Sequence, residues 1–400
     1  MECGRNRKGD MIEPKIGVYT HNYSPEVSPV VKGLLSYLAL NKVDVNLIVN
    51  SLGIDSNFKL QDVPIIELIP SEFHFRKPIM GESSNKVLRK IRKSANTLID
   101  QSIDILNKRK LRAIITGYDL VIAIEWYALI ELYEVGYPIS KIIYFSLEAE
   151  DNFGRCDKNL VIRLLSQCAF CIIQSKEREE GLKNFLGIDI EFEHLPVSMR
   201  PIDVSLIKQE KDIGNNSDIR IIYSGYFAEW ACITEFIDGY TALSMKVPLS
   251  LAIHGHYLGT EQYLERIRSS QAKAKNLSIS TDYLNDDAHI KYLSQFNIGL
   301  AFYKSISGTS NWENLLFSSG KIASYLWAGL AVMTNIKTPR TLVPPFLYLN
   351  DFSGFEIKNQ LEKYLSQADK FHQSALEFAF EFYNLDKYMD TIIRRLQGAL

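Results

Sequence analysis

The chain has 400 residues, of which 46% are hydrophobic and 11% aromatic, and its formal net charge is -2 at pH 7. This composition excludes a disordered chain, predicts two or more domains and gives no electrostatic basis for binding nucleic acid. The five cysteines are few and odd in number, which favours a reducing compartment over a disulfide framework. No apolar run reaches the length of a signal or membrane-spanning segment, so we expect a cytoplasmic protein.

Strand-like and helix-like patterns alternate through the first half of the chain. A β-rich run at Lys15–Thr20, a helical pattern at Glu26–Leu40 and a second β-rich run at Val43–Val49 form a βαβ opening. Later strands are predicted at Val63–Leu68, Leu120–Ile124, Lys141–Phe145, Phe170–Gln174 and Ile190–His194, and helices at Asn85–Lys110, Trp126–Glu134, Lys158–Ser166 and Glu177–Phe185. The alternation predicts a doubly wound domain at 15–197, after a flexible extension at 1–14.

The pattern stops near Pro196–Asp218, where Pro, Lys, Asn, Gly and Ser predict a linker at 198–218. It then resumes with strands at Ile219–Ser224, Leu249–His254, Leu277–Ser280, Ile298–Phe302 and Ala331–Thr334, and helices at Cys232–Ser244, Thr260–Ser270 and Asp287–Gln295. We expect a second Rossmann-like domain at 219–375, and C-terminal helices at 376–400 that pack back on the first domain. Two such domains imply a cleft between them, and ligands prefer such clefts.

Residues 318–334 form the most informative motif. Small residues and one lysine open a helix that ends at Gly329 and leads into a short apolar strand. A helix start carries unpaired N–H groups and partial positive charge, Gly320 lets an anion approach the backbone, and Lys321 adds a full charge. The motif follows the strand Ile298–Phe302, so it lies at the ligand-binding edge of the sheet. It predicts a phosphate site, whereas a plain helix start with a solvated lysine is the alternative.

Several segments carry a resemblance to one family. They are Gly320–Val332, Ile222–Gly225, Leu251–His256 and Leu277–Ser280 in the second half, and Ile143–Glu148 and Ile172–Ser175 in the first. In order and spacing the chain resembles retaining glycosyltransferases of the GT-B fold, in the broad family-4 class. The resemblance implies an α/β protein with two Rossmann-like domains whose parallel sheets face a central cleft.

The resemblance also implies an activity. Such a protein is a glycosyltransferase of the EC 2.4 class, which moves a sugar from a nucleotide donor, UDP or GDP, to a hydroxyl of a glycan or lipid-linked acceptor. From the same resemblance we expect that the configuration of the sugar is retained and that the protein acts in surface polysaccharide or glycoconjugate biosynthesis. We also expect that it needs no cofactor or metal. Because bond breaking leaves negative charge on the diphosphate and positive character on the sugar, fixed charges and oxygen-rich groups are needed at the site.

The candidate site residues divide by role. Catalytic candidates at predicted strand ends and in one loop are His21, Glu125, Glu148 and Glu313. Donor contacts are expected from Gly225, Tyr226, His254, His256, Tyr283, Ser318, Ser319, Gly320, Lys321 and Ser324, and acceptor contacts from Asn22 and Tyr23. The structural alternatives are loop and turn histidines bonded to backbone or exposed to water, and carboxylates in ordinary salt bridges.

The chain departs from the family at two places. Most relatives carry a pair of glutamates around the motif helix, and the second glutamate binds the donor ribose. Here Leu316 stands at the first of these positions and Ser324 at the second. Relatives also often place an arginine and a lysine after the glycine that matches Gly225, where this chain has Tyr226–Cys232. The alternatives are therefore a non-catalytic homologue that partners an active transferase, or a nucleotide-sugar epimerase or hydrolase.

Three further patterns allow more than one interpretation. Cys168 and Cys171 have no second pair, so core packing explains them better than zinc, and Asp286-Asp287 is explained by helix capping. Basic clusters within 86–112 flank one long predicted helix. Such a helix docks on anionic lipid, which would make the protein peripheral to the inner face of a membrane, whereas a solvated helix face is the alternative.

Overall fold

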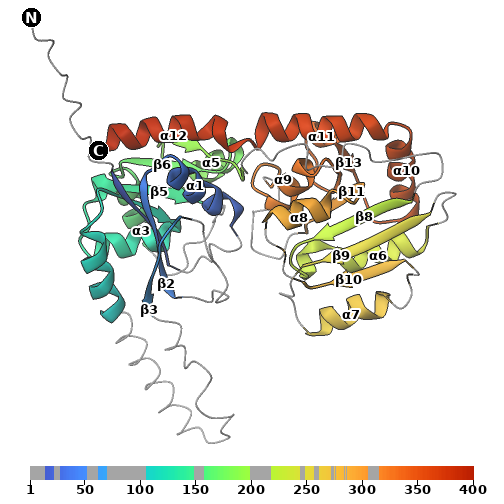
Figure 1. Cartoon of the computed structure of the whole chain (residues 1–400), viewed down its shortest axis with the longest axis horizontal. Helices are drawn as coiled ribbons and strands as arrows, with labels where there is room; N and C mark the ends of the chain where they lie inside the picture. The colour runs from blue at the N-terminus through green and yellow to red at the C-terminus, as the bar shows by residue number, and fades with distance from the viewer. Residues whose placement is uncertain are drawn as a thin grey trace, which may run out of the picture.

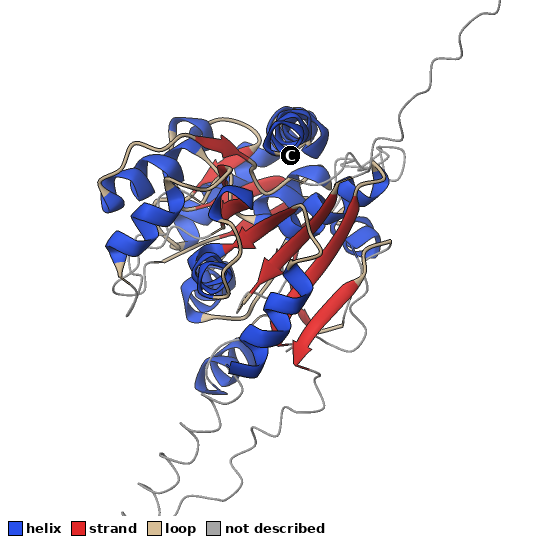
Figure 2. Cartoon of the chain, turned by 90° about the vertical axis from the view of Figure 1, so that its left-hand side faces the viewer, coloured by secondary structure: helices blue, strands red, loops and turns tan. Residues whose placement is uncertain are grey.

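The computed structural model describes residues 14–21, 28–51, 62–69, 105–147, 157–198, 218–243, 248–255, 261–271, 274, 276–282, 284, 286–304 and 315–400. Within them the chain forms two parallel sheets, one in each half of the sequence (Figure 1). Helices lie on both sides of the strands (Figure 2), as expected for doubly wound domains.

The first sheet has the strand order β3-β2-β1-β4-β5-β6-β7. Its strands are β1 (Lys15–Thr20), β2 (Asp44–Ser51), β3 (Ile65–Ile69), β4 (Leu120–Ile124), β5 (Ile142–Ser146), β6 (Phe170–Ile173) and β7 (Phe192–His194). Strands β4 and β5 are buried along their whole length, which explains why they are almost purely apolar rather than alternating. The order reverses between β1 and β4, which are parallel neighbours.

The second sheet has the order β10-β9-β8-β11-β12-β13. Its strands are β8 (Ile219–Ser224), β9 (Leu249–His254), β10 (Leu277–Ser280), β11 (Ile298–Ala301), β12 (Ala331–Thr334) and β13 (Phe346–Tyr348). The order reverses here between β8 and β11. Strand β13 was missed in the sequence, because three residues after two prolines are too short to show a period.

Helices and short 3-10 turns connect the strands. They are α1 (Pro29–Leu40), α3 (Glu125–Glu134), η3 (Ile139–Lys141), α4 (Lys158–Leu165), α5 (Lys176–Leu186), η5 (Glu229–Ala231), α6 (Ile233–Thr241), α7 (Glu261–Gln271), α8 (Asp286–Leu293), α9 (Gly320–Trp327) and η6 (Pro339–Leu342). Residues 105–115 are also helical. Helix α1 begins with proline at its first position after an N-cap serine, Ser28, whose hydroxyl accepts a hydrogen bond from Val31 N.

The last three helices link the two domains. They are α10 (Gly354–Leu365), α11 (Ala368–Phe382) and α12 (Leu385–Ala399). Helices α11 and α12 run end to end along one side of the molecule, α11 beside the second domain and α12 beside the first (Figure 1). Arg395 on α12 pairs with Glu193 on β7, with 2.8 Å between Nε and Oε1. Residue 376, where we divided the chain, lies inside α11.

One apolar core runs through both domains. It contains Val31 of α1 and Phe145 of β5 from the first half, and Leu326 of α9 and Met389 of α12 from the second. A backbone hydrogen bond from Val197 N to Phe317 O also crosses between the halves. The predicted α/β class with two Rossmann-like domains is thus confirmed, and the domains are packed together rather than joined only by a linker.

Candidate functional site

Two switch points organise the candidate site. In open α/β sheets, ligands bind beyond the carboxyl ends of the strands where the strand order reverses. In the first sheet this point lies between the ends of β1 and β4, which His21 and Glu125 follow. In the second sheet it lies between the ends of β8 and β11, which Gly225 and Phe302 follow. The strand order therefore directs attention to these four chain positions.

His21 forms a carboxylate-bound pair at the first switch point. Its Nδ1 lies 2.7 Å from Oε2 of Glu131, a buried residue of α3. The same carboxylate oxygen accepts a hydrogen bond from the Tyr19 hydroxyl, and the His21 ring stacks on Tyr127 with 5.8 Å between centroids. A carboxylate on Nδ1 fixes the tautomer and leaves Nε2 as the basic nitrogen, the arrangement of a proton acceptor.

Glu125 has a structural contact. It begins α3 with a φ of 65°, in the left-handed region that side chains other than glycine rarely adopt. Its carboxylate accepts a hydrogen bond from Leu147 N at 2.5 Å, which ties the end of β4 to the end of β5. Arg178 donates to Leu147 O and to Gln174 Oε1, so the same corner is braced from α5. Buried to 8% exposure, Glu125 holds the sheet edge on which His21 lies.

The starts of α1 and α9 meet between the domains. A Cβ placed on Gly320 would lie 2.9 Å from Cγ of Pro29, the first residue of α1. Ser319 caps α9 by accepting a hydrogen bond from Ile322 N at 3.3 Å, and Ser318 is half-buried beside it. The unpaired N–H groups and positive dipole ends of two helices are thereby brought to one place. This convergence favours an anion there.

Lys321 lies at the second switch point among aromatic rings. Its Nζ is 4.3 Å from the ring centroid of Tyr223, 5.2 Å from that of Trp230 and 5.1 Å from that of Tyr303. It also donates a hydrogen bond of 3.2 Å to the Tyr223 hydroxyl. We call Tyr223, Trp230 and Tyr303 the aromatic cage. Among the described residues no carboxylate forms an ion pair with Lys321, and burial lowers the pKa of the amine to about 7.

Glycines shape the floor of this site. Gly225 has a φ of 150°, and a Cβ on it would lie 3.1 Å from Cε of Lys321. Gly255, with a φ of 143°, lies so close to the chain after β8 that a Cβ on it would be 1.9 Å from Gly225 O. Tyr226 accepts a hydrogen bond of 2.5 Å from the Tyr223 hydroxyl through its carbonyl oxygen. Only glycine allows the lysine and two backbone segments to approach this closely.

A polar row lies beside the cage. Ser224, His254 and Ser280 are register partners at the ends of β8, β9 and β10. Nδ1 of His254 lies 3.2 Å from Ser280 Oγ, and Nε2 of His289 on α8 lies 2.8 Å from Ser224 Oγ. Hydroxyls and imidazoles at a strand edge suit the hydroxyls and base of a nucleotide.

Ser324, a predicted donor contact, is buried within α9 at 5% exposure. Its neighbour Tyr325 is fully buried and accepts a hydrogen bond of 2.7 Å from Ser224 N while donating one of 3.2 Å to Leu300 O. Helix α9 is therefore fixed to the ends of β8 and β11, on both sides of the switch point.

The predicted residues are brought together in part. Gly225, Tyr226, Ser319, Gly320 and Lys321 converge at one place. Six predicted residues lie outside the described ranges: Asn22, Tyr23, Glu148, His256, Tyr283 and Glu313. The same holds for most of the basic segment 86–112, whose residues 105–112 are described as helix.

Sequence reasoning missed Glu131, Trp230, Tyr303 and His289. Glu131, Trp230 and His289 lie on helices or a 3-10 turn that follow or precede a switch-point strand by several residues, and Tyr303 lies two residues after β11. Two signals were present in the sequence: an acidic residue at Glu131 on an otherwise apolar helix face, and a tryptophan in the segment where relatives carry basic residues.

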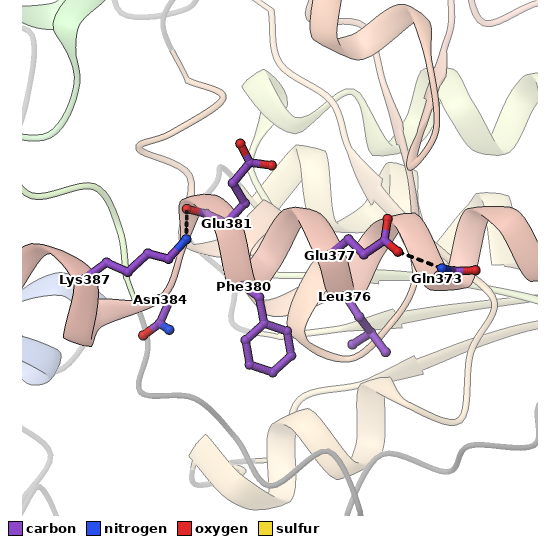
Figure 3. A pocket seen from close by; sticks show the side chains of 7 residues that line it. All are labelled: Gln373, Leu376, Glu377, Phe380, Glu381, Asn384 and Lys387. Atoms are coloured by element: carbon purple, nitrogen blue, oxygen red, sulfur yellow. Dashed lines mark hydrogen bonds between the residues drawn. The ribbon is translucent and has the colours of Figure 1, made fainter.

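A surface pocket lies away from these residues. It has a volume of about 520 Å³ and is lined by α11 and the start of α12 (Figure 3). The lining residues are Gln373, Leu376, Glu377, Phe380, Glu381, Asn384 and Lys387. None of them follows a strand, so we do not assign the candidate site here.

Among the described residues no helix is long and apolar enough to cross a membrane, and no group of three or more His, Cys, Asp or Glu residues is placed to hold a metal ion.

Comparison with known proteins identifies the fold. No family model matches the chain, and no curated protein matches its sequence. HepE (Alr3699) of Anabaena, in a crystal structure with UDP, matches with a TM-score of 0.66 at 12% identity, over 96% of this chain and 100% of that chain. A glycosyltransferase from Rickettsia africae matches with a TM-score of 0.65 at 12% identity, over 97% and 99% of the two chains.

A third structure has the same architecture. An α,α-trehalose-phosphate synthase (UDP-forming) from Burkholderia vietnamiensis matches with a TM-score of 0.61 at 10% identity, over 97% of both chains. The matches span nearly the whole of each chain and therefore include both domains. Together with the two parallel sheets and their switch points, they show that this chain has the GT-B fold.

Proposed function

We propose that this protein is a glycosyltransferase that moves a sugar from a nucleotide-sugar donor to a hydroxyl of a glycan or lipid-linked acceptor. One observation carries the proposal: the Lys321 amine, without a carboxylate partner among the described residues, lies at a switch point beside Gly225 and the start of α9. An uncompensated cation beside free helix N–H groups suits a diphosphate.

The proposed donor is a UDP-sugar. HepE was crystallised with UDP and with UDP-glucose, and the trehalose-phosphate synthase is UDP-forming. The diphosphate would lie against the start of α9 and Lys321, and the nucleoside along the row of Ser224, His254 and Ser280. This orientation places the sugar toward the start of α1 and the first domain, because Gly320 contacts Pro29.

The proposed chemistry uses charge at both ends of the breaking bond. As the bond from the anomeric carbon to the diphosphate oxygen breaks, its electron pair stays on that oxygen, where Lys321 and the helix N–H groups stabilise it. The acceptor oxygen forms the new bond and loses its proton. We assign His21, held by Glu131, to orient this hydroxyl and receive its proton. Configuration is proposed to be retained, and surface glycan or glycoconjugate assembly is the proposed role.

The missing ribose glutamate favours one rival. Ser324 is buried and Leu316 is apolar, which suits a non-catalytic homologue that binds a nucleotide sugar and partners an active transferase. The two functions differ in turnover, not in binding. The same assay detects an epimerase or hydrolase, which would act without an acceptor.

Nucleotide binding and turnover test the proposal. We expect UDP to bind the purified protein, the Lys321→Ala variant to lose at least tenfold in affinity, and the exposed-lysine control Lys337→Ala to bind like the wild type. A panel of UDP-, GDP- and dTDP-sugars with lipid and glycan acceptors then tests transfer, and NMR of the product reports its anomeric configuration. Binding without turnover favours the non-catalytic homologue, and an inverted product rejects retention.

A further inference from the structure

The aromatic cage takes one ring from the segment that follows Gly225. The segment 226–232, in which relatives often carry basic residues, supplies Trp230 instead. The indole stacks on Tyr303 with 5.9 Å between centroids and an angle of 3° between planes. Tyr303 is itself fixed: its hydroxyl lies 2.5 Å from Ser319 Oγ, and its N–H donates to Asn335 Oδ1 at 3.0 Å. The cage is therefore a rigid structure attached to the cap of α9.

Within the described part of the chain, no group around the amine offsets its charge. Burial raises the pKa of Tyr303 to about 12 and that of Tyr223 well above its usual range, so both phenols stay neutral. Burial likewise raises the pKa of the nearby Cys232 thiol to about 12. Glu235 is already paired with Lys304, with 2.6 Å between its Oε1 and Nζ, and Glu229 is exposed to solvent. Among the described residues, the Lys321 amine thus contacts ring faces and a neutral hydroxyl, with a neutral thiol nearby.

We infer that the aromatic cage of Tyr223, Trp230 and Tyr303 positions the Lys321 amine for the diphosphate of the donor, and that donor binding is coupled to the uptake of one proton by this amine. The inference rests on the proposed function and adds a regulation by pH to the same site. In it, one caged lysine replaces the basic pair of the relatives.

The physical reason is the difference between the two environments. In the free protein the amine is withdrawn from water and has no counter-ion among the described residues, which disfavours its charged form. A diphosphate beside Gly225 supplies that counter-ion and favours the ammonium. Since the pKa of the free amine is about 7, a protein near pH 8 must bind a proton as it binds the nucleotide. Affinity should then fall as the pH rises through the range above 7.

Calorimetry of UDP binding tests the coupling. The heat of UDP binding is to be measured between pH 7.5 and 9, which lies above the phosphate pKa of about 6. Buffers of different ionisation enthalpy then report how many protons the protein takes up on binding. The wild type should take up close to one proton near pH 8, and its dissociation constant should rise several-fold per pH unit. Lys321→Arg, which stays protonated, should bind UDP without proton uptake or this slope. Lys337→Arg should behave like the wild type.

Variants of the cage test the positioning. Trp230→Leu removes one ring and should weaken UDP binding at least fivefold, and Tyr223→Phe keeps the ring but removes the hydrogen bond to Nζ. Circular dichroism shows whether each variant is folded. If Trp230→Leu does not fold, Tyr223→Phe alone tests the positioning role. Wild-type affinity in both folded variants would overturn the positioning role.

A second measurement needs no nucleotide. The pH dependence of acetylation of Lys321 by acetic anhydride, followed by mass spectrometry, gives the titration midpoint of the free amine, which should lie far below the ordinary lysine value of 10.5. UDP binding without proton uptake, or a midpoint near 10.5, would overturn the coupling while leaving the transferase proposal in place. Failure of UDP, GDP and dTDP to bind would overturn the proposed function and the coupling together, whatever the midpoint.

Discussion

Lys321 is a candidate binding residue whose burial opposes folding. Lowering a lysine pKa from 10.5 to about 7 corresponds to a net cost of roughly 5 kcal/mol for burying the charged form, at about 1.4 kcal/mol per unit. This cost destabilises the folded protein below pH 7 unless an anion binds, so we explain this residue by binding rather than by stability.

Replacement of Lys321 by methionine should stabilise the protein. The unfolded chain binds the proton more tightly, so the wild-type lysine is most destabilising below pH 7, and this effect disappears as the pH rises from 7 to 10.5. We expect Lys321→Met to raise the melting temperature by several degrees at pH 6 and by less at pH 9, while UDP binding is lost. Thermal denaturation at both pH values measures this. A lower melting temperature for the variant at pH 6 would contradict the assigned burial.

The pair of His21 and Glu131 allows a test with a matched control. Glu131→Gln removes the charge that orients the imidazole, so turnover should fall about 100-fold with little change in the KM of the donor. Glu134→Gln lies on the same helix, but Glu134 pairs at 2.8 Å with Lys108 near the surface, and turnover should stay at the wild-type level. Steady-state kinetics and the pH profile measure both. Unchanged turnover in Glu131→Gln would remove His21 from the proposed mechanism.

The sequence predicted part of the site at the scale of residues. Gly320 and Lys321 could be predicted because a helix start and its small residues are local features of the chain. The partners Trp230 and Tyr303 are 91 and 18 residues from Lys321 in the sequence and reach it only because β8 and β11 are neighbours. Contacts of that kind depend on strand order, which a single sequence does not encode locally.

At the scale of elements, α9 is the part that connects both domains. Tyr325 fixes it to β8 and β11, and a Cβ on Gly299 of β11 would lie 2.3 Å from the Tyr325 ring. At its start Gly320 leaves room for Pro29 of α1. The position of the predicted anion site therefore depends on two glycines whose side chains would occupy filled space.

A Gly320→Ala variant tests the contact between the start of α9 and Pro29 of α1. Alanine favours helices, but its Cβ would lie 2.9 Å from a proline ring that cannot rotate away, so the helix start must shift. We expect a loss of about 1–3 kcal/mol in stability and weaker UDP binding. Gly181→Ala in α5 is the control, because a Cβ there meets nothing within 4 Å, and it should stabilise by up to about 1 kcal/mol. Denaturant unfolding compares the two. Equal effects of the two substitutions would argue against the contact of α9 with α1.

Elements were predicted more completely than contacts. The strands from β1 to β12 were all predicted, although the ends of several shift by a few residues, and all of them except the three-residue β7 have four or more residues. Strand β13 has three residues and exists because it pairs with β12, so its signal is tertiary. The Glu125 backbone, with its positive φ, likewise has no signal in the local sequence.

At the scale of the whole molecule, α12 joins the end of the chain to the first domain. Its buried face consists of Leu385, Met389, Ile392 and Leu396, all in the core that also contains residues of α1 and α9. A continuous core predicts that the two domains unfold together, because separating them exposes this apolar face to water. We therefore expect the GT-B fold of this chain to unfold as one cooperative unit, with the proposed ligand site between its two halves.

Two substitutions on α12 distinguish burial from charge in this coupling. Met389→Ala removes a fully buried side chain between the domains and should lower the free energy of unfolding by about 2–5 kcal/mol. Arg395→Ala removes the half-exposed pair with Glu193 and should cost less than about 1 kcal/mol. Calorimetry should show one transition for the wild type and Arg395→Ala, and UDP should raise the melting temperature of that whole transition, because its site depends on both domains. Two separate transitions in the wild type would mean that the shared core does not couple the domains. If UDP then raised only the melting temperature of the second domain, the nucleotide would be bound by that domain alone.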